Sequence, residues 1–122
     1  MVAMTSYLPV IQPDDLDVCC SPVTGGVVGD EAAETLARAF KALGDPTRVK
    51  LLSLIAAAPG GEACICDMTE PVGLSQPTVS HHMKLLVEAS LAVREQRGRM
   101  AYYRVVPEAL ASLAGALTPT GD

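Results

Sequence analysis

The sequence predicts a mainly α-helical fold with a β-hairpin wing, that is, a winged helix-turn-helix. Three observations predict it. Apolar residues recur at helical spacing through most of residues 30–89. Within that range, a short helix, a turn that contains Gly73 and a helix capped by Ser75 follow one another closely. Two strand-like runs then flank Arg97-Gly98-Arg99, a tripeptide typical of a hairpin tip.

The first two helices are expected on either side of Gly44. The first begins at Asp30, and Gly44 ends it. Its apolar positions, three and four residues apart, are Ala33, Leu36, Phe40 and Leu43. Asp45 is expected to cap the second helix, and Pro46 fits the first turn because no N–H is needed there. The second helix ends at the break formed by residues 59–61.

The helix-turn-helix follows this break. Its first helix is short, begins near Cys66 or Asp67 and breaks before Gly73. Ser75 caps its second helix, which is expected over residues 76–89.

The wing and one last helix complete the predicted fold. Strands are expected at 91–97 and 100–106, joined by the hairpin tip. Pro107 opens the last helix. The apolar stripe of that helix consists of Leu110, Leu113 and Leu117.

We expect one folded domain, because 122 residues have room for a single modest core. Residues 1–29 hold three prolines, three glycines and no sustained period, so we expect a flexible arm that carries Cys19 and Cys20. The folded domain is expected at 30–117, and a short tail at 118–122.

Charges are segregated along the chain, although the net charge is −5. Residues 1–34 hold six acidic residues and no Lys or Arg, whereas residues 75–104 hold five basic residues and two acidic ones. Salt confines charge effects to about 8–10 Å. The basic segment can therefore contact a phosphate backbone despite the acidic total.

The helix at 76–89 has one apolar and one polar face. At about 100° a residue, Val79, Met83 and Leu86 form a core stripe, and His82 lies nearer to that stripe than His81. The helix start, its polar face and the hairpin tip supply the candidate DNA contacts, which are Ser75, Gln76, Thr78, Ser80, His81, Lys84, Arg97 and Arg99. Polar side chains at such a helix start can approach base edges, and arginines beside a glycine suit phosphate or a narrow minor groove. The alternative is a face that is only solvated.

All four cysteines occur in two couples, Cys19-Cys20 and Cys64-Ile65-Cys66. If the second couple is extended, its thiols point to one side and Ile65 points into the core. Thiolates select soft ions, among them zinc and cadmium and, by the same logic, trivalent arsenic and antimony. Arsenic needs three sulfurs, and zinc or cadmium usually needs four ligands, so the missing donors must come from the arm, within or between subunits. Two alternatives are buried cysteines that only fill the core and vicinal thiols that form a disulfide on oxidation.

The segments FKALGDPTRVKLLSLI, CICDM, GLSQPTVSHHMKLLVEA and RGRMAYYRV together resemble the ArsR/SmtB family, the homodimeric winged-helix metal sensors of bacteria. The resemblance covers about residues 34–110. It implies that residues 75–84 read DNA, that residues 91–106 form the wing, and that the first and last helices form the dimer interface. One departure is Ser90, where many relatives have a glycine that eases a left-handed helix end.

The same resemblance bears on the cysteines. The CxCD motif at 64–67 is similar to the metal-binding box of arsenic sensors and cadmium/lead sensors, and amino-terminal cysteines complete the site in the latter. It implies that Cys64 and Cys66 are ligands, and that Cys19 and Cys20 on the arm supply the rest. The arsenic-type box often has a third cysteine shortly after CxCD, and this chain has none there. The zinc site that some relatives have on the last helix is expected to be absent, since that helix lacks the ligand pairs.

The predicted function is a homodimeric transcriptional repressor that releases double-stranded operator DNA when trivalent arsenic or antimony binds its cysteine thiolates. The alternatives are a cadmium-, lead- or zinc-responsive repressor with a four-thiolate site, and a repressor that senses thiol redox state. An enzyme is not expected, because the chain lacks a C-x-x-C pair and a phosphate-binding loop. A structural zinc module is disfavoured because the C-x₂-C spacings are missing.

The protein is expected to be cytoplasmic and to bind no membrane. Its longest apolar run falls short of the ~20 residues that span a bilayer, and its first residues lack the features of a signal peptide. Because the cytoplasm keeps thiols reduced, cysteines there are more often ligands or redox groups than structural disulfides.

Overall fold

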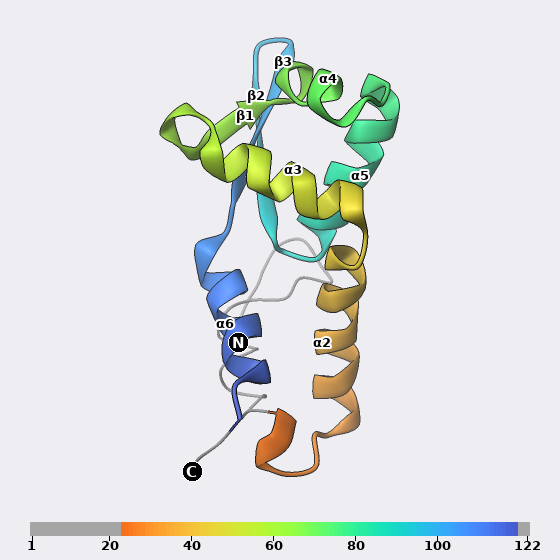
Figure 1. Ribbon diagram of the computed structural model, residues 1–122, viewed down its shortest axis with the longest axis vertical. Coiled ribbons are helices and arrows are strands. Elements are labelled where there is room, and N and C mark those ends of the chain that lie inside the picture. The colour runs from red at the N-terminus through yellow and green to blue at the C-terminus, as the bar shows by residue number, and fades with distance from the viewer. Residues whose placement is uncertain (1–22, 120–122) are drawn as a thin grey trace.

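The computed structural model describes residues 23–119, in which a winged body lies at one end and two helices, α2 and α6, extend from it in the same direction (Figure 1). In chain order the elements are η1 Val23–Gly25, α2 Asp30–Leu43, α3 Pro46–Ala57, η2 Pro59–Gly61, β1 Glu62–Cys64, η3 Ile65–Asp67, α4 Thr69–Val72, α5 Gln76–Glu88, β2 Ala92–Arg97, β3 Met100–Val105 and α6 Pro107–Leu117. The predicted winged helix-turn-helix is confirmed: α4 and α5 form the helix-turn-helix, and β2 and β3 form the wing. Most of the expected arm, including Cys19 and Cys20, lies outside the described residues, as do residues 120–122.

Helix starts and ends lie close to where the sequence predicts them. Asp45 caps α3, because its Oδ2 atom accepts from the N–H groups of Thr47 at 2.9 Å and Arg48 at 3.2 Å. Gly73 ends α4 in the left-handed conformation that glycine adopts without strain.

The prediction of the apolar face of α2 is partly wrong. Its buried residues are Ala32, Leu36, Ala39 and Ala42. Ala33 is exposed, and the larger Phe40 and Leu43 are only half-buried. Small alanines fit the contacts of α2 with α3 and α5, so the buried face is rotated away from the larger side chains.

The sheet has three antiparallel strands in the order β1-β3-β2. The hairpin of β2 and β3 is as predicted, and Gly98 at its tip has a positive φ of 61°. The sequence did not predict β1, which pairs Glu62 with Arg104 and Cys64 with Tyr102. A strand of three residues is too short to show the alternation by which strands are recognised. Its position carries Cys64 to the edge of the sheet that also forms the wing.

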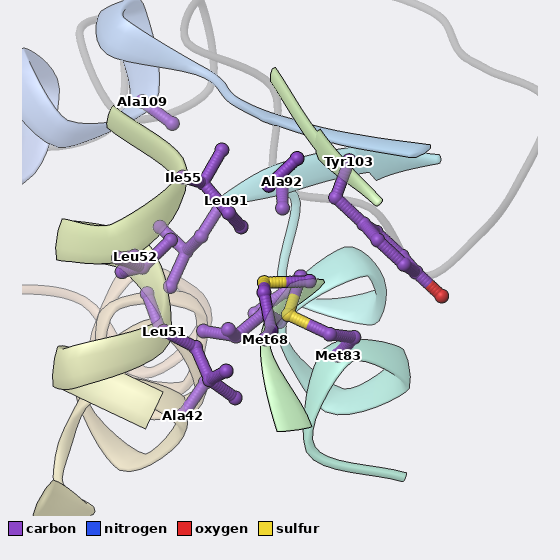
Figure 2. Close-up of a cluster of buried hydrophobic side chains, with 14 of the residues drawn as sticks. Ala42, Leu51, Leu52, Ile55, Met68, Met83, Leu91, Ala92, Tyr103 and Ala109 are labelled. Carbon is purple, nitrogen blue, oxygen red and sulfur yellow. The ribbon is translucent and has the colours of Figure 1, made fainter. Parts of the chain in front are cut away.

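The core of the winged body lies between α3, α5 and the sheet (Figure 2). The predicted stripe of α5 is confirmed, since Val79, Met83 and Leu86 have no exposed surface. Met68 and Met83 lie side by side in this core, next to Leu51 (Figure 2). Unbranched methionines fill irregular gaps, and they pack α5 firmly against the segment that follows Cys66.

The last helix, α6, buries less of its predicted stripe than expected. Leu113 is buried, Leu110 is half-buried and Leu117 is 58% exposed. The remaining buried residues of α6 are Ala109 and Ala116. Thus part of the stripe faces away from the protomer. Within residues 23–119, no helix combines the length and apolarity needed to cross a membrane.

Candidate nucleic-acid interface and cysteine site

The polar face of α5 begins at its cap. Ser75 Oγ accepts from the Thr78 N–H at 3.4 Å and lies 3.0 Å from Thr78 Oγ1, so the two hydroxyl groups pair with each other. Beyond this turn Ser80, His81 and Lys84 are exposed, opposite the buried stripe. His81 is exposed whereas His82 is half-buried, as predicted.

A groove of about 410 Å³ separates α5 from the wing. We call it the wing groove, and its lining residues are Ile65, Gln76, Ser80, Lys84, Val87, Glu88, Arg94, Gln96, Arg99, Ala101 and Tyr103. It brings together four of the eight candidate DNA contacts, Gln76, Ser80, Lys84 and Arg99. Basic groups from the helix and from the wing thus line one hollow, which suits a backbone phosphate.

Two further polar residues of the wing groove were missed from the sequence. Arg94 donates to Gln96 Oε1 at 2.5 Å, and Gln96 donates to the Gly98 carbonyl at 3.0 Å. These contacts orient the Arg94 guanidinium and support the turn. Their common position could have been predicted from the sequence, because residues two apart on a strand share a face, as Arg94 and Gln96 do on β2.

Arg97 lies away from the wing groove. Its guanidinium donates to both carboxylate oxygens of Glu62 at 2.7 Å and to Glu95 at 2.8 Å. It also lies over the Tyr102 ring, 4.5 Å from the ring centroid. The structure therefore does not bring Arg97 together with Arg99, and pairs its charge with two carboxylates instead of leaving it for phosphate. The bidentate contact joins β1 to the wing.

The ion pairs of Arg97 with Glu62 and Glu95 favour the charged forms of all three side chains. Hydrogen bonds from Arg97 lower the pKa of Glu62 and of Glu95 below the ordinary value of 4.5. Hydrogen bonds to Glu62 and Glu95 in turn raise the pKa of Arg97. The wing is therefore joined to β1 by groups that stay ionised at neutral pH.

Cys64 and Cys66 converge, although not for the reason predicted. Cys64 ends β1 and is 3% exposed, whereas Cys66 lies on the 3₁₀ turn η3 and is exposed. The turn, rather than an extended strand, returns Cys66 towards Cys64, and the Cys66 N–H donates to Cys64 Sγ at 3.3 Å. Ile65 points into the core, as predicted.

The structure joins Cys64 and Cys66 in a disulfide, with their Cα atoms 5.3 Å apart. This differs from the expectation of reduced thiols. The Sγ atoms and an Asp67 carboxylate oxygen lie within 4.8 Å of one another. In the reduced form this cluster offers two soft sulfur donors and one oxygen donor to an ion. Cys19 and Cys20, the other predicted ligands, lie outside the described residues.

Ile65 connects the cysteine site to the wing groove. It lies between the two cysteines in the sequence, is 4% exposed and lines the groove. Its turn, η3, packs against both α5 and β3. A rearrangement at the cysteines would therefore reach α5 and β3, which both line the groove, through one buried side chain.

The model of the bacterial regulatory proteins of the arsR family matches residues 45–92, which include α3, the helix-turn-helix and the start of the wing. The chain is 42% identical over 69 residues to the arsenic resistance transcriptional regulator ArsR1 of Pseudomonas putida, with 57% of this chain and 52% of that protein covered. It is 39% identical over 90 residues to a putative arsenical resistance operon repressor, ArsR2, of Halobacterium salinarum, with 74% and 73% covered. It is also 37% identical over 73 residues to a homolog of the cadmium resistance regulator CadC of Staphylococcus aureus, with 60% and 59% covered.

Two solved structures show the same architecture. The homodimeric winged helix-turn-helix DNA-binding domain of a possible ArsR-family regulator from Mycobacterium bovis superimposes with a TM-score of 0.60 at 25% identity, with 74% of this chain and 83% of that chain covered. The antimony-specific transcriptional repressor AntR superimposes with a TM-score of 0.61 at 27% identity, with 73% and 79% covered. All of these similar proteins are transcriptional regulators rather than enzymes.

Proposed function

Because this chain belongs to the arsR family of bacterial regulatory proteins, a family of DNA-binding transcriptional repressors, we propose that it is a homodimer that releases its operator when trivalent arsenic or antimony binds. The proposal has three parts: the DNA contacts, the inducer site and the connection between them.

The DNA part is supported by the wing groove. In a helix-turn-helix dimer each reading helix enters a major groove, and the two half-sites lie about 34 Å apart. We assign α5 to the major groove and the wing to the adjacent backbone. Lys84, Arg94 and Arg99 then contact phosphates, whereas Gln76, Ser80 and His81 approach base edges.

The inducer part rests on one observation, the convergence of Cys64 and Cys66 beside α5. Two thiolates suit a soft ion but are one donor short of the three sulfurs that trivalent arsenic takes. When bound, such an ion supplies bonds that draw its sulfur donors together. Cys19 or Cys20 is the proposed third donor. For binding, the disulfide must first be reduced and both thiols must lose their protons.

Ile65 supports the proposed connection, because it is buried, follows Cys64 directly in the sequence and lines the wing groove. Rearrangement of η3 moves Ile65, and with it the spacing of α5 and the wing. Release then follows from linkage, since an ion that prefers the DNA-incompetent state weakens operator binding. A coupling of about 1–3 kcal/mol weakens it 5–150-fold.

Two alternatives each have an observation in their favour. The carboxylate of Asp67 beside the sulfurs favours zinc, cadmium or lead, which accept mixed or tetrahedral ligand sets, over arsenic. The Cys64–Cys66 disulfide favours a redox sensor. In that reaction a peroxide takes two electrons and two protons from the two thiols and is reduced to water as the S–S bond forms.

Operator release, measured by gel shift, distinguishes these functions. The reduced protein is titrated with arsenite, antimonite, cadmium, lead, zinc and peroxide. We expect arsenite and antimonite to release operator, and expect Cys64→Ser to abolish release while DNA binding stays near normal. The Cys19→Ser/Cys20→Ser double variant should also fail to respond. A normal arsenite response in that double variant would contradict the proposed use of the arm, and release by peroxide alone would favour the redox sensor.

A further inference from the structure

One arginine connects three helices behind the reading face of α5. Arg48 lies in the first turn of α3, where its Nε donates to the Ala42 carbonyl at 2.6 Å and its Nη2 to the Lys41 carbonyl at 3.5 Å. Those carbonyls belong to the last turn of α2. On its other side, Arg48 Nη1 lies 3.0 Å from Nδ1 of His82, on α5. One side chain thus contacts α2 and α5 while it belongs to α3.

The chemistry of the three groups explains this contact. The last carbonyls of a helix lack partners within the helix and carry the negative end of its dipole, so they attract a cation. A guanidinium has five donors in a rigid fork, so Arg48 can satisfy α2 and still donate to His82. A lysine has a single nitrogen at the end of a flexible chain and cannot reach both.

A hydrogen bond from Arg48 to Nδ1 requires one particular tautomer of His82. Arginine can only donate, so the Nδ1 atom of His82 must accept, and its proton must lie on Nε2. Only the neutral imidazole has this free lone pair. The His82 side chain is 17% exposed and follows His81, which faces outward on α5. Its orientation is therefore tied to the rotation of α5 about its axis.

We propose that Arg48 and neutral His82 are positioning residues that fix the rotation of α5 relative to α2, and so set the angle at which His81 and Lys84 meet DNA. The proposal rests on the DNA-reading role proposed for α5. The pair touches no base or phosphate. It acts by coupling the reading helix to α2, one of the two helices assigned to the dimer interface.

Protonation of His82 would break this connection. It removes the Nδ1 lone pair and places a positive charge beside the Arg48 guanidinium. Asp45 Oδ2, 4.0 Å from Nδ1, then becomes the favoured partner of the imidazolium. The other charged or titratable groups around the pair are Arg38, Lys41 and Glu88, which line an adjacent groove with Arg48, and the His81 ring, 6.4 Å away. A protonated His82 would therefore exchange its contact with Arg48 on α3 for one with Asp45, the residue that caps α3.

The test uses the full-length chain and fluorescence anisotropy with operator and random DNA. Arg48→Gln should weaken operator binding about tenfold, as expected for loss of a hydrogen bond to a charged group, and should leave the salt slope unchanged. If Arg48 instead contacts phosphate, the slope falls by about 0.9. That result would overturn the proposal.

A pH profile separates positioning from a merely structural role. His82→Gln keeps an acceptor for Arg48 but does not titrate. Under acid conditions in which the imidazole carries a second proton, the wild type should lose about tenfold in operator affinity relative to His82→Gln. His81 is present in both proteins, so its own effect on DNA binding cancels in the ratio. A ratio that is independent of pH would contradict the proposal.

Two further measurements distinguish a failure of the Arg48–His82 contact from a failure of the proposed DNA docking. In the DNA-free protein, imidazole nitrogen chemical shifts should show the Nε2–H tautomer of His82 at pH 8, and Arg48→Gln should abolish this preference. A mixed tautomer in the wild type would contradict the proposed contact whether or not α5 reads DNA. Lys84→Ala tests the docking itself, since an unchanged salt slope there contradicts the proposed function and not the Arg48–His82 pair.

Discussion

Ser90 holds a left-handed conformation, with φ of 63°, at the end of α5. Leu91 N–H donates to the Leu86 carbonyl at 3.0 Å and Ser90 N–H to the Val87 carbonyl at 2.9 Å, the two bonds of a Schellman motif. The chain thus leaves α5 as it would with glycine, although the Cβ of an L-residue costs about 1–2 kcal/mol in this region. Serine thus adopts here the left-handed conformation that glycine eases in many relatives.

Ser90→Gly should therefore be more stable than Ser90→Ala. Removal of the Cβ relieves the strain, and the greater entropy of glycine in the unfolded chain offsets part of the gain, so we expect a difference of about 0.5–1 kcal/mol in the free energy of unfolding between these two variants. Urea denaturation at a fixed protein concentration measures it. Ser90→Ala is the matched control, because it removes the hydroxyl and keeps the Cβ. An equal gain in both variants would show that strain is not the cause.

Residue-scale features were predictable where their partners are near in sequence. Asp45 and Ser75 cap helices through N–H groups two or three residues away, so the local pattern suffices. The partners of Arg97 and Arg48 were not predictable. Glu62 lies 35 residues from Arg97, and His82 lies 34 residues from Arg48, so only the fold brings these pairs together.

At the scale of elements, the wing presents its two tip arginines differently. Arg99 lines the wing groove, whereas Arg97 is paired with Glu62 and Glu95 on the other side of β2. The sequence identifies both as basic residues at a hairpin tip but cannot tell them apart. Their difference depends on β1, the strand that was too short to predict and that supplies Glu62.

Salt dependence of DNA binding should separate the two arginines. Arg99→Ala removes a cation that has no ion-pair partner within residues 23–119, so it should weaken binding to all DNA and reduce the slope of log affinity against log salt by about 0.9. Arg97→Ala should leave that slope near the wild-type value, because its charge is already paired. It should instead lower the melting temperature, since the contact between β1 and the wing is lost. Equal loss of slope in both variants would place Arg97 on the phosphates.

The contact between β1 and the wing also has a defined pH dependence. The pKa values of Glu62 and Glu95 are lower in the folded protein than the ordinary 4.5, so folding favours their ionised forms. Their contribution to stability is fully present above that value and is lost as the pH falls through the lower, folded values. Acid unfolding of the wild type below about pH 4.5 should therefore include a component that Arg97→Ala lacks.

For the molecule as a whole, the protomer leaves apolar surface on the two helices that extend from the winged body (Figure 1). Leu117 of α6 is 58% exposed, and Phe40 of α2 and Leu110 of α6 are only half-buried. The periodicity of the sequence predicted these positions as one apolar stripe per helix. It could not show which members face the protomer and which face a second copy, because both surfaces have the same composition.

If a second copy of the chain covers these helices, negative charge introduced on the apolar stripe of α6 should separate the dimer. Leu110→Glu/Leu117→Glu should shift the protein from dimer to monomer in sedimentation velocity, because burial of the two carboxylates at an apolar interface is costly. Operator affinity should fall at least about 100-fold, since a monomer loses the second half-site and its effective concentration. Val49→Glu is the control, because Val49 is 53% exposed and lies on α3 rather than on α2 or α6. If the double variant stays dimeric and binds operator as the wild type does, α6 is not part of the interface, and the partner surface must lie on another face of the molecule.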